Sequence, residues 1–146
     1  SKLLAINNYH YRRGGAEVVF LEQVRLFERN GWTVAPFSMQ HPKNEASPWS
    51  DYFADEIEFG HDYSLLTKLR HAGQIIYNLP ASRDLQRLIA DFNPDVVHAH
   101  NVYHHLSPSV LRTASQAGLP VFLTLHDLKL ACPAYSMISH GAVCEA

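Results

Sequence analysis

The strongest constraint on the fold is an alternation of short apolar runs with longer segments whose apolar residues recur at three- and four-residue spacing. A short apolar run bounded by turn residues is typical of a buried strand, and the longer spacing is typical of a helix. We expect strands at residues 2–7, 33–38, 55–59, 96–100 and 120–125. We expect helices from residue 16 to a stop at 30–31, over 63–77, from a cap at 82 to 92, and from a cap at 107 to a stop at 118. This order predicts an α/β, Rossmann-like fold: a mostly parallel sheet with helices on both faces.

Prolines and small polar residues set the expected helix ends. Pro80 is expected to end the helix at 63–77, and Ser82 to cap the next one. Ser107 is expected to be an N-cap, with Pro108 as the first helical residue. Residues 39–53 lack periodicity and are expected to form a surface loop.

Composition excludes several classes of protein. The chain has 146 residues, of which 47% are hydrophobic and 18% charged, and this fits one globular domain. Its formal net charge is -2 and its basic residues are scattered, so we expect no nucleic-acid partner. No apolar run reaches the roughly 20 residues that span a bilayer, and we expect a cytoplasmic location. Cys132 and Cys144 are too few for a disulfide scaffold and supply only half of a four-thiolate zinc site.

Ligands of such sheets bind at the carboxyl ends of the strands, and the first segment selected by this rule contains Gly14 and Gly15. They lie between a strand and a helix amino terminus, where free backbone amides and the helix dipole favour an anion such as a pyrophosphate. The alternative is a tight turn that needs positive φ. Arg12 and Arg13 precede the glycines, and they fit either an anion site or a solvated loop.

Histidines follow the later strands. His98 and His100 are two positions apart on one strand, so they should point to the same face. They could bind zinc, or be buried histidines that bond to the backbone. His126 and Asp127 follow the strand at 120–125, which we expect in the middle of the sheet, where acid, base or acceptor-holding groups belong. The alternative is that Asp127 caps a turn and His126 fills space.

Taken together, four segments resemble the amino-terminal domain of glycosyltransferase family 4. They are residues 2–7, 13–17, 95–101 and 123–127, which include a Gly-Gly-Ala-Glu loop and a later His-Asp pair. The resemblance implies the amino-terminal, acceptor-side half of a two-domain GT-B fold. On this interpretation residues 1–146 form an incomplete Rossmann-like domain, and the carboxyl-terminal donor-binding domain is absent.

The resemblance also implies an activity: retaining transfer of a hexosyl group from a nucleoside-diphosphate sugar to an acceptor hydroxyl, with no cofactor and no metal. The implied partners are the nucleotide sugar and a glycan or lipid-linked acceptor; a lipid-linked acceptor would bring the chain to the inner face of the membrane as a peripheral protein. The chain alone is expected to be inactive. The implied site comprises catalytic His126 and Asp127, donor-phosphate-binding Arg13, Gly14 and Gly15, and acceptor-binding His10, His100, Asn101 and Tyr103.

Within this interpretation His126 has a positioning role, beside the acceptor and the sugar. Asp127 should point the other way if the strand continues, and so orient the loop or the acceptor. Two other classes of function stay open. One is a metal-dependent hydrolase that uses His98, His100, His126 and Asp127, and the other is a non-catalytic module that binds a ligand in the same cleft.

Overall fold

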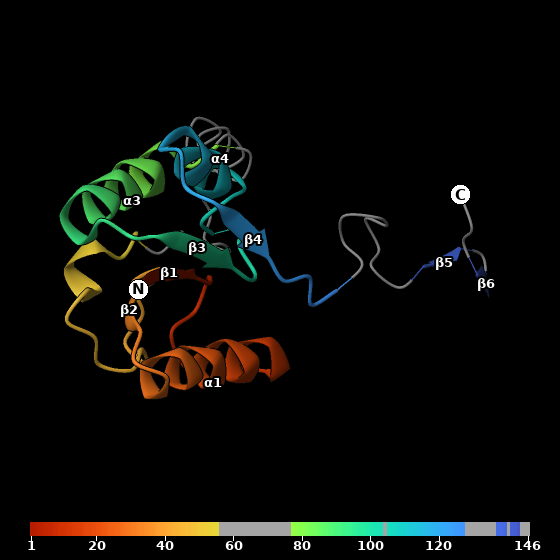
Figure 1. Cartoon of the computed structure of the whole chain (residues 1–146). Helices are drawn as coiled ribbons and strands as arrows, with labels where there is room; N and C mark the ends of the chain where they lie inside the picture. Colours follow the sequence, from red (N-terminus) through yellow and green to blue (C-terminus); the bar gives the residue numbers. More distant parts are fainter. Residues whose placement is uncertain (56–76, 104, 128–136, 140, 144–146) are drawn as a thin grey trace.

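The core of the protein is a parallel sheet of four strands in the order β2-β1-β3-β4. The computed structural model describes residues 1–55, 77–103, 105–127, 137–139 and 141–143. The strands are β1 (Lys2–Ile6), β2 (Thr33–Phe37), β3 (Val96–Ala99) and β4 (Val121–Leu123). Helix α1 (Gly15–Arg29) covers one face, and α3 (Leu79–Phe92) and α4 (Ser109–Gln116) cover the other (Figure 1). The predicted Rossmann-like α/β fold with helices on both faces is confirmed.

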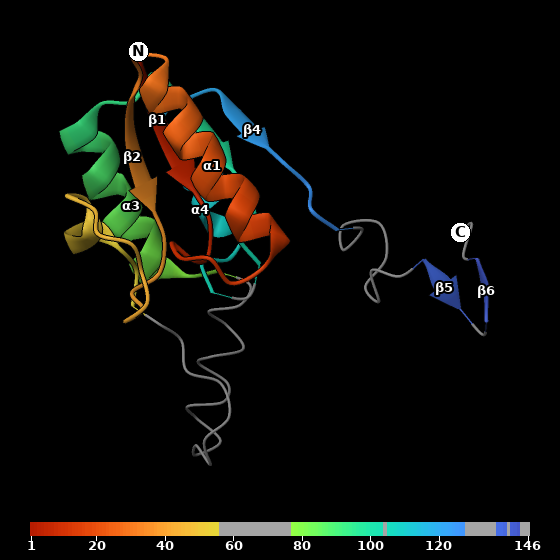
Figure 2. The same cartoon turned by 90° about the horizontal axis from the view of Figure 1, so that it is seen from below.

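Alternation along the strands divides the core into two layers. Leu3 and Ala5 of β1 pack with Phe20, Leu21 and Val24 of α1. The intervening residues of β1 pack on the opposite side, in a larger cluster that includes apolar residues of α3 and α4. Figure 2 looks at the sheet from the side of α1, which lies over β1. Because side chains alternate between faces, β1, β2 and β3 contribute to both layers.

The helix starts differ from those expected. Pro80 lies in the first turn of α3, and the N-cap is Asn78, whose side-chain oxygen accepts a bond from the amide of Ala81 at 3.1 Å. The expected cap at Ser82 was therefore wrong, because proline fits a first turn that needs no amide donor there. Helix α4 begins at Ser109 with Pro108 as its N-cap, one residue later than expected.

The strands end earlier than expected, and β4 has a different place. The predicted strand at 120–125 stops at Leu123, so His126 lies three residues beyond it. Among the described strands β4 is outermost rather than central, and its Phe122 side chain is 61% exposed. The apolar run of this segment did not reveal its position, because composition does not fix strand order.

Three further segments can be compared with the sequence predictions. The loop at 39–53 contains a short 3-10 helix, η1 (Ser50–Tyr52). A two-strand antiparallel hairpin, β5 (Ile138–Ser139) and β6 (Ala142–Val143), was not predicted. The expected helix at 63–77 and nearly all of the expected strand at 55–59 lie outside the described residues, as do Cys132 and Cys144.

We expect Leu85→Ala to lower the free energy of unfolding by about 2–5 kcal/mol, because it removes a fully buried side chain and leaves a cavity. Leu79→Ala in the same helix is the matched control. Its side chain is 55% exposed, so the loss should stay below about 1 kcal/mol. Urea unfolding checks both values, and equal losses would contradict the assignment of Leu85 to the core.

Candidate active site

Two buried asparagines join the loops that follow β1 and β3. The side-chain oxygen of Asn7 accepts a bond from the amide of Asn101 at 3.1 Å. The side chain of Asn8 donates to the carbonyl of Tyr103 at 2.6 Å and accepts from the amide of Leu106 at 3.2 Å. These bonds satisfy backbone groups of buried or partly buried residues. They fix the loop after β3 at the carboxyl edge of the sheet.

Three histidine rings form a row at this edge. The rings of His98 and His100 stack with centroids 4.7 Å apart, and those of His100 and His126 with centroids 5.1 Å apart. Nδ1 of His100 lies 2.8 Å from Nε2 of His126, and Nε2 of His98 lies 2.8 Å from the hydroxyl of Thr124. His98 on β3 and His100, the residue directly after β3, point to the same side of the sheet, as predicted.

Burial keeps the middle of this row neutral. His100 is 2% exposed and packs edge-to-face against Phe20 of α1, with centroids 5.4 Å apart. Burial, followed by the neighbouring His98 and His126, lowers the pKa of His100 to about 3. Burial and then His126 also lower the pKa of His98. His100 is therefore neutral at pH 7, with one protonated ring nitrogen.

Tyr103 and Asp127 lie beside the row. Burial is the main cause that raises the pKa of Tyr103, and the Asp127 carboxylate adds to it. The hydroxyl of Tyr103 is buried, and no described residue bonds to it. Such a hydroxyl can bond to a ligand. His100, His126, Asp127 and Tyr103 are thus near one another, and Asn101 is half-buried on the same loop as Tyr103.

The two glycines of the first loop do not require positive φ. Gly14 is the N-cap of α1 with φ -156°, and Gly15 is not among the residues with positive φ. The tight-turn explanation therefore fails. A Cβ built on Gly15 would meet no atom within 4 Å, whereas one on Gly14 would lie 3.2 Å from a carboxylate oxygen of Glu17. Open space at the start of α1 is what an approaching ligand requires.

The arginines next to these glycines already have contacts. Arg12 pairs with Glu22 of α1. The Arg13 guanidinium lies over the ring of Tyr9, 4.3 Å from its centroid. Both arginines are exposed, so these contacts are weak and can be exchanged for a ligand.

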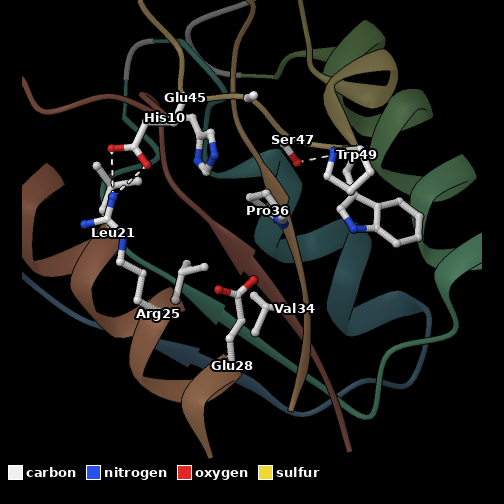
Figure 3. A pocket seen from close by; sticks show the side chains of 12 residues that line it. His10, Leu21, Arg25, Glu28, Val34, Pro36, Glu45, Ser47 and Trp49 are labelled. Carbon is white, nitrogen blue, oxygen red and sulfur yellow. Dashed lines mark hydrogen bonds and ion pairs between the residues drawn. The ribbon is translucent and has the colours of Figure 1, made fainter. Parts of the chain in front are cut away.

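His10 lies in a different place, a pocket of about 170 Å³ between α1 and β2 (Figure 3). Its ring points into this pocket, whose charged residues include Arg25 and Glu45, joined by an ion pair of 2.9 Å. Burial is the first cause that lowers the pKa of His10. His10 and His100 both pack edge-to-face against Phe20, at 6.1 and 5.4 Å. Among the described residues no hydrogen bond or ring contact joins His10 to His126, whose ring contact is with His100.

The histidine row bears on the hydrolase alternative. A metal site needs nitrogen and oxygen atoms that converge on one point. The nearest ring nitrogens here face each other or Thr124, and the part of the chain that the structure describes holds no group of three potential ligands suited to a metal. The arrangement of the histidine rings does not favour a metal-dependent hydrolase.

Comparison with known families agrees with this architecture. The family model for the glycosyl transferase 4-like domain matches residues 14–143, which include α1, the histidine row and Asp127. The chain belongs to this family. It is therefore a glycosyltransferase domain. The match begins after β1 and after the asparagines Asn7 and Asn8. A search among curated proteins found no match to the chain. No helix in the described ranges is long and apolar enough to cross a membrane.

Sequence reasoning missed four residues that shape this family member's site. Asn7 and Asn8 fix the loop after β3, Phe20 contacts both His10 and His100, and Thr124 bonds to His98. A polar pair directly after a buried strand was an available signal for the asparagines. Nothing in the sequence pattern distinguished Phe20 from the other apolar residues of α1.

We expect the free energy of unfolding to fall as pH drops below about 6.5, the ordinary histidine value. Between that pH and a pKa of about 3, the unfolded chain binds a proton that folded His100 does not, so acid favours unfolding. His100 should account for at most about 2 kcal/mol between pH 7 and pH 5. His100→Asn should show a shallower dependence in urea unfolding at several pH values. An equal slope in both proteins would contradict a buried neutral His100.

Proposed function

We propose that the chain is the amino-terminal, acceptor-side domain of a retaining hexosyltransferase that uses a nucleoside-diphosphate sugar. The family supports transfer of a sugar. The observation that carries the proposal further is the position of His126 at the carboxyl edge of the sheet. There His126 contacts buried His100 and lies beside Asp127 and Tyr103. Ligands of open α/β sheets bind at this edge.

In the proposed reaction the bond between the anomeric carbon and the diphosphate oxygen breaks, and the acceptor oxygen forms a new bond to the same face of that carbon. The hydroxyl proton passes to the departing diphosphate oxygen. The protein must then hold the hydroxyl and the sugar in attacking geometry and stabilise the developing charge. His126, Asp127, Asn101 and the Tyr103 hydroxyl, to which no described residue bonds, are suited to the first task.

The open space at Gly15 and the free amides of the first turn of α1 support a diphosphate site next to this centre. Glu17 is buried in the same turn, and Arg12 is paired with Glu22, so the positive charge available here is limited. We therefore propose that further cations come from a second domain, as in a GT-B enzyme. We also propose a cytoplasmic location, where the enzyme would meet its nucleotide sugar and a glycan or lipid-linked acceptor.

Gly15→Val should abolish binding of UDP and GDP to the chain, because the new side chain would fill the space that the diphosphate enters. Arg29→Val is the matched control, since it adds the same side chain at the exposed far end of α1. NMR titration with each nucleotide detects weak binding. If nucleotide binding survives Gly15→Val, this loop is not part of the donor site. The same conclusion follows if the wild-type chain binds neither nucleotide.

His126→Ala should lower kcat/KM of the enzyme that contains this chain by roughly 10² or more, because lost positioning is felt mainly in the transition state. Donor affinity should change little. Steady-state kinetics with separate donor titration measure both effects, and Leu79→Ala serves as a surface control. A folded His126→Ala enzyme within about threefold of wild type would overturn the assignment.

A further inference from the structure

The pocket around His10 is separate from the histidine row. Side chains of α1, β2 and the loop at 39–53 line it together with His10 (Figure 3). Its volume of about 170 Å³ is close to the roughly 150 Å³ of an apolar cavity that holds benzene, so it accommodates one six-membered ring. The reaction centre proposed above, which contains His126 and Asp127, contributes no side chain to this lining.

His10 supplies the observation that points to a ligand. This residue is 5% exposed, its ring points into the pocket, and its Nδ1 is buried without a partner. Burial lowers the pKa of His10, so the ring is neutral at pH 7 and carries one N–H. A buried N–H without an acceptor costs more than an empty lone pair. The proton of His10 is therefore on Nε2, at the tip of the ring.

The Nε2–H group of His10 is free to donate. This nitrogen is not among the buried atoms that lack a partner, and no described residue bonds to it. Solvent therefore reaches Nε2, and it does so from the pocket into which the ring points (Figure 3). A ligand in the pocket meets a hydrogen-bond donor at His10.

Charged side chains give the pocket both acceptors and donors. Arg25 bonds to Glu45 at 2.9 Å, and also to Glu22, which lies outside the lining. Glu28 is exposed, and its carboxylate has no ion pair or hydrogen bond with a described residue. Two carboxylates and one guanidinium give the lining a net charge of 1 - 2 = -1 while His10 is neutral. This charge disfavours a phosphate or a carboxylate as the ligand.

The mixture of donors and acceptors narrows the ligand further. An ammonium group only donates hydrogen bonds, so it could pair with Glu28 but would leave the N–H of His10 without an acceptor. A hydroxyl group donates and accepts, so a ring that carries several hydroxyls can satisfy both side chains at once. Leu21, Val34 and Pro36 add an apolar surface on which the C–H groups of such a ring can pack.

We propose that this pocket binds one neutral pyranose unit. One of its hydroxyl oxygens accepts from Nε2–H of His10, and another hydroxyl donates to Glu28. The sugar is either a free monosaccharide or one unit of a longer glycan. The inference stands on the groups that line the pocket and does not rest on the proposed function, so it can be tested on the chain without any donor.

The test is NMR titration of the chain with the methyl α-pyranosides of glucose, mannose and galactose. At least one should shift the amide signals of lining residues such as Val34 and Ala46. Inorganic phosphate and cyclohexylammonium should bind more weakly than that glycoside. Long-range ¹H–¹⁵N NMR at about pH 8 should show the proton of His10 on Nε2.

Two variants test the contacts. Glu28→Gln and His10→Phe should each weaken binding of the glycoside at least about fivefold, the effect of roughly one hydrogen bond. Asp51→Asn is the matched control, because it removes the same charge from an exposed carboxylate outside the lining, and its affinity should stay unchanged. Glu28 is exposed and has no partner, so its variant folds even if His10→Phe does not.

Four outcomes would overturn the inference. They are no shift of lining residues with any of the three glycosides, tighter binding of cyclohexylammonium than of all three, a proton on Nδ1 of His10, and an unchanged affinity in Glu28→Gln. Sugar binding in a protein that transfers no sugar would leave the pocket assigned and contradict the proposed function.

Kinetics of the enzyme that contains this chain distinguish the two sources of the sugar. If the pocket holds a unit of a glycan acceptor, Glu28→Gln should raise the KM for that acceptor about fivefold and leave the KM for the donor unchanged. If both KM values stay unchanged while the glycoside binds more weakly, the occupant is a free monosaccharide.

Discussion

The carboxyl edge of the sheet depends on the buried amide side chains of Asn7 and Asn8. Parallel strands place their ends at one edge, but the loops that follow them are independent until something joins them. Here the asparagines bond to backbone groups of Asn101, Tyr103 and Leu106, at distances from 2.6 to 3.2 Å. Buried amides with satisfied bonds act as rigid connections, because breaking them leaves unpaired polar groups away from water. The position of Tyr103 follows from this connection, whereas the amide of His100 is bonded to the carbonyl of Ile6 at 2.8 Å.

Phe20 has a second organising role. Its ring packs edge-to-face against both His10 and His100. The contact with Phe20 contributes to the burial of His100, and burial favours the neutral imidazole. Phe20 is thus one of the residues that bury His100.

The glycines at the start of α1 show how the structure separates two explanations that the sequence left open. A pair of glycines between a strand and a helix fits both a tight turn and a ligand site. The backbone of Gly14 is extended, and a side chain at Gly15 would enter open space. Conformational need is therefore not the reason for these glycines. Space for a ligand beside the helix amino terminus remains, and it supports the diphosphate proposal.

The sequence by itself determined the alternation of strands and helices, and hence the parallel sheet covered on both faces, because hydrophobic periodicity is a local property. It also placed His98 and His100 on one face of their strand, since side chains alternate along a strand. Only the tertiary structure decided that β4 lies at an edge of the four described strands of the sheet, that Asn78 caps α3, and that His10 lines a pocket between α1 and β2. These outcomes depend on which segments pack together across long sequence separations. The bond between His100 and His126 joins residues 26 positions apart, and no local pattern encodes that distance.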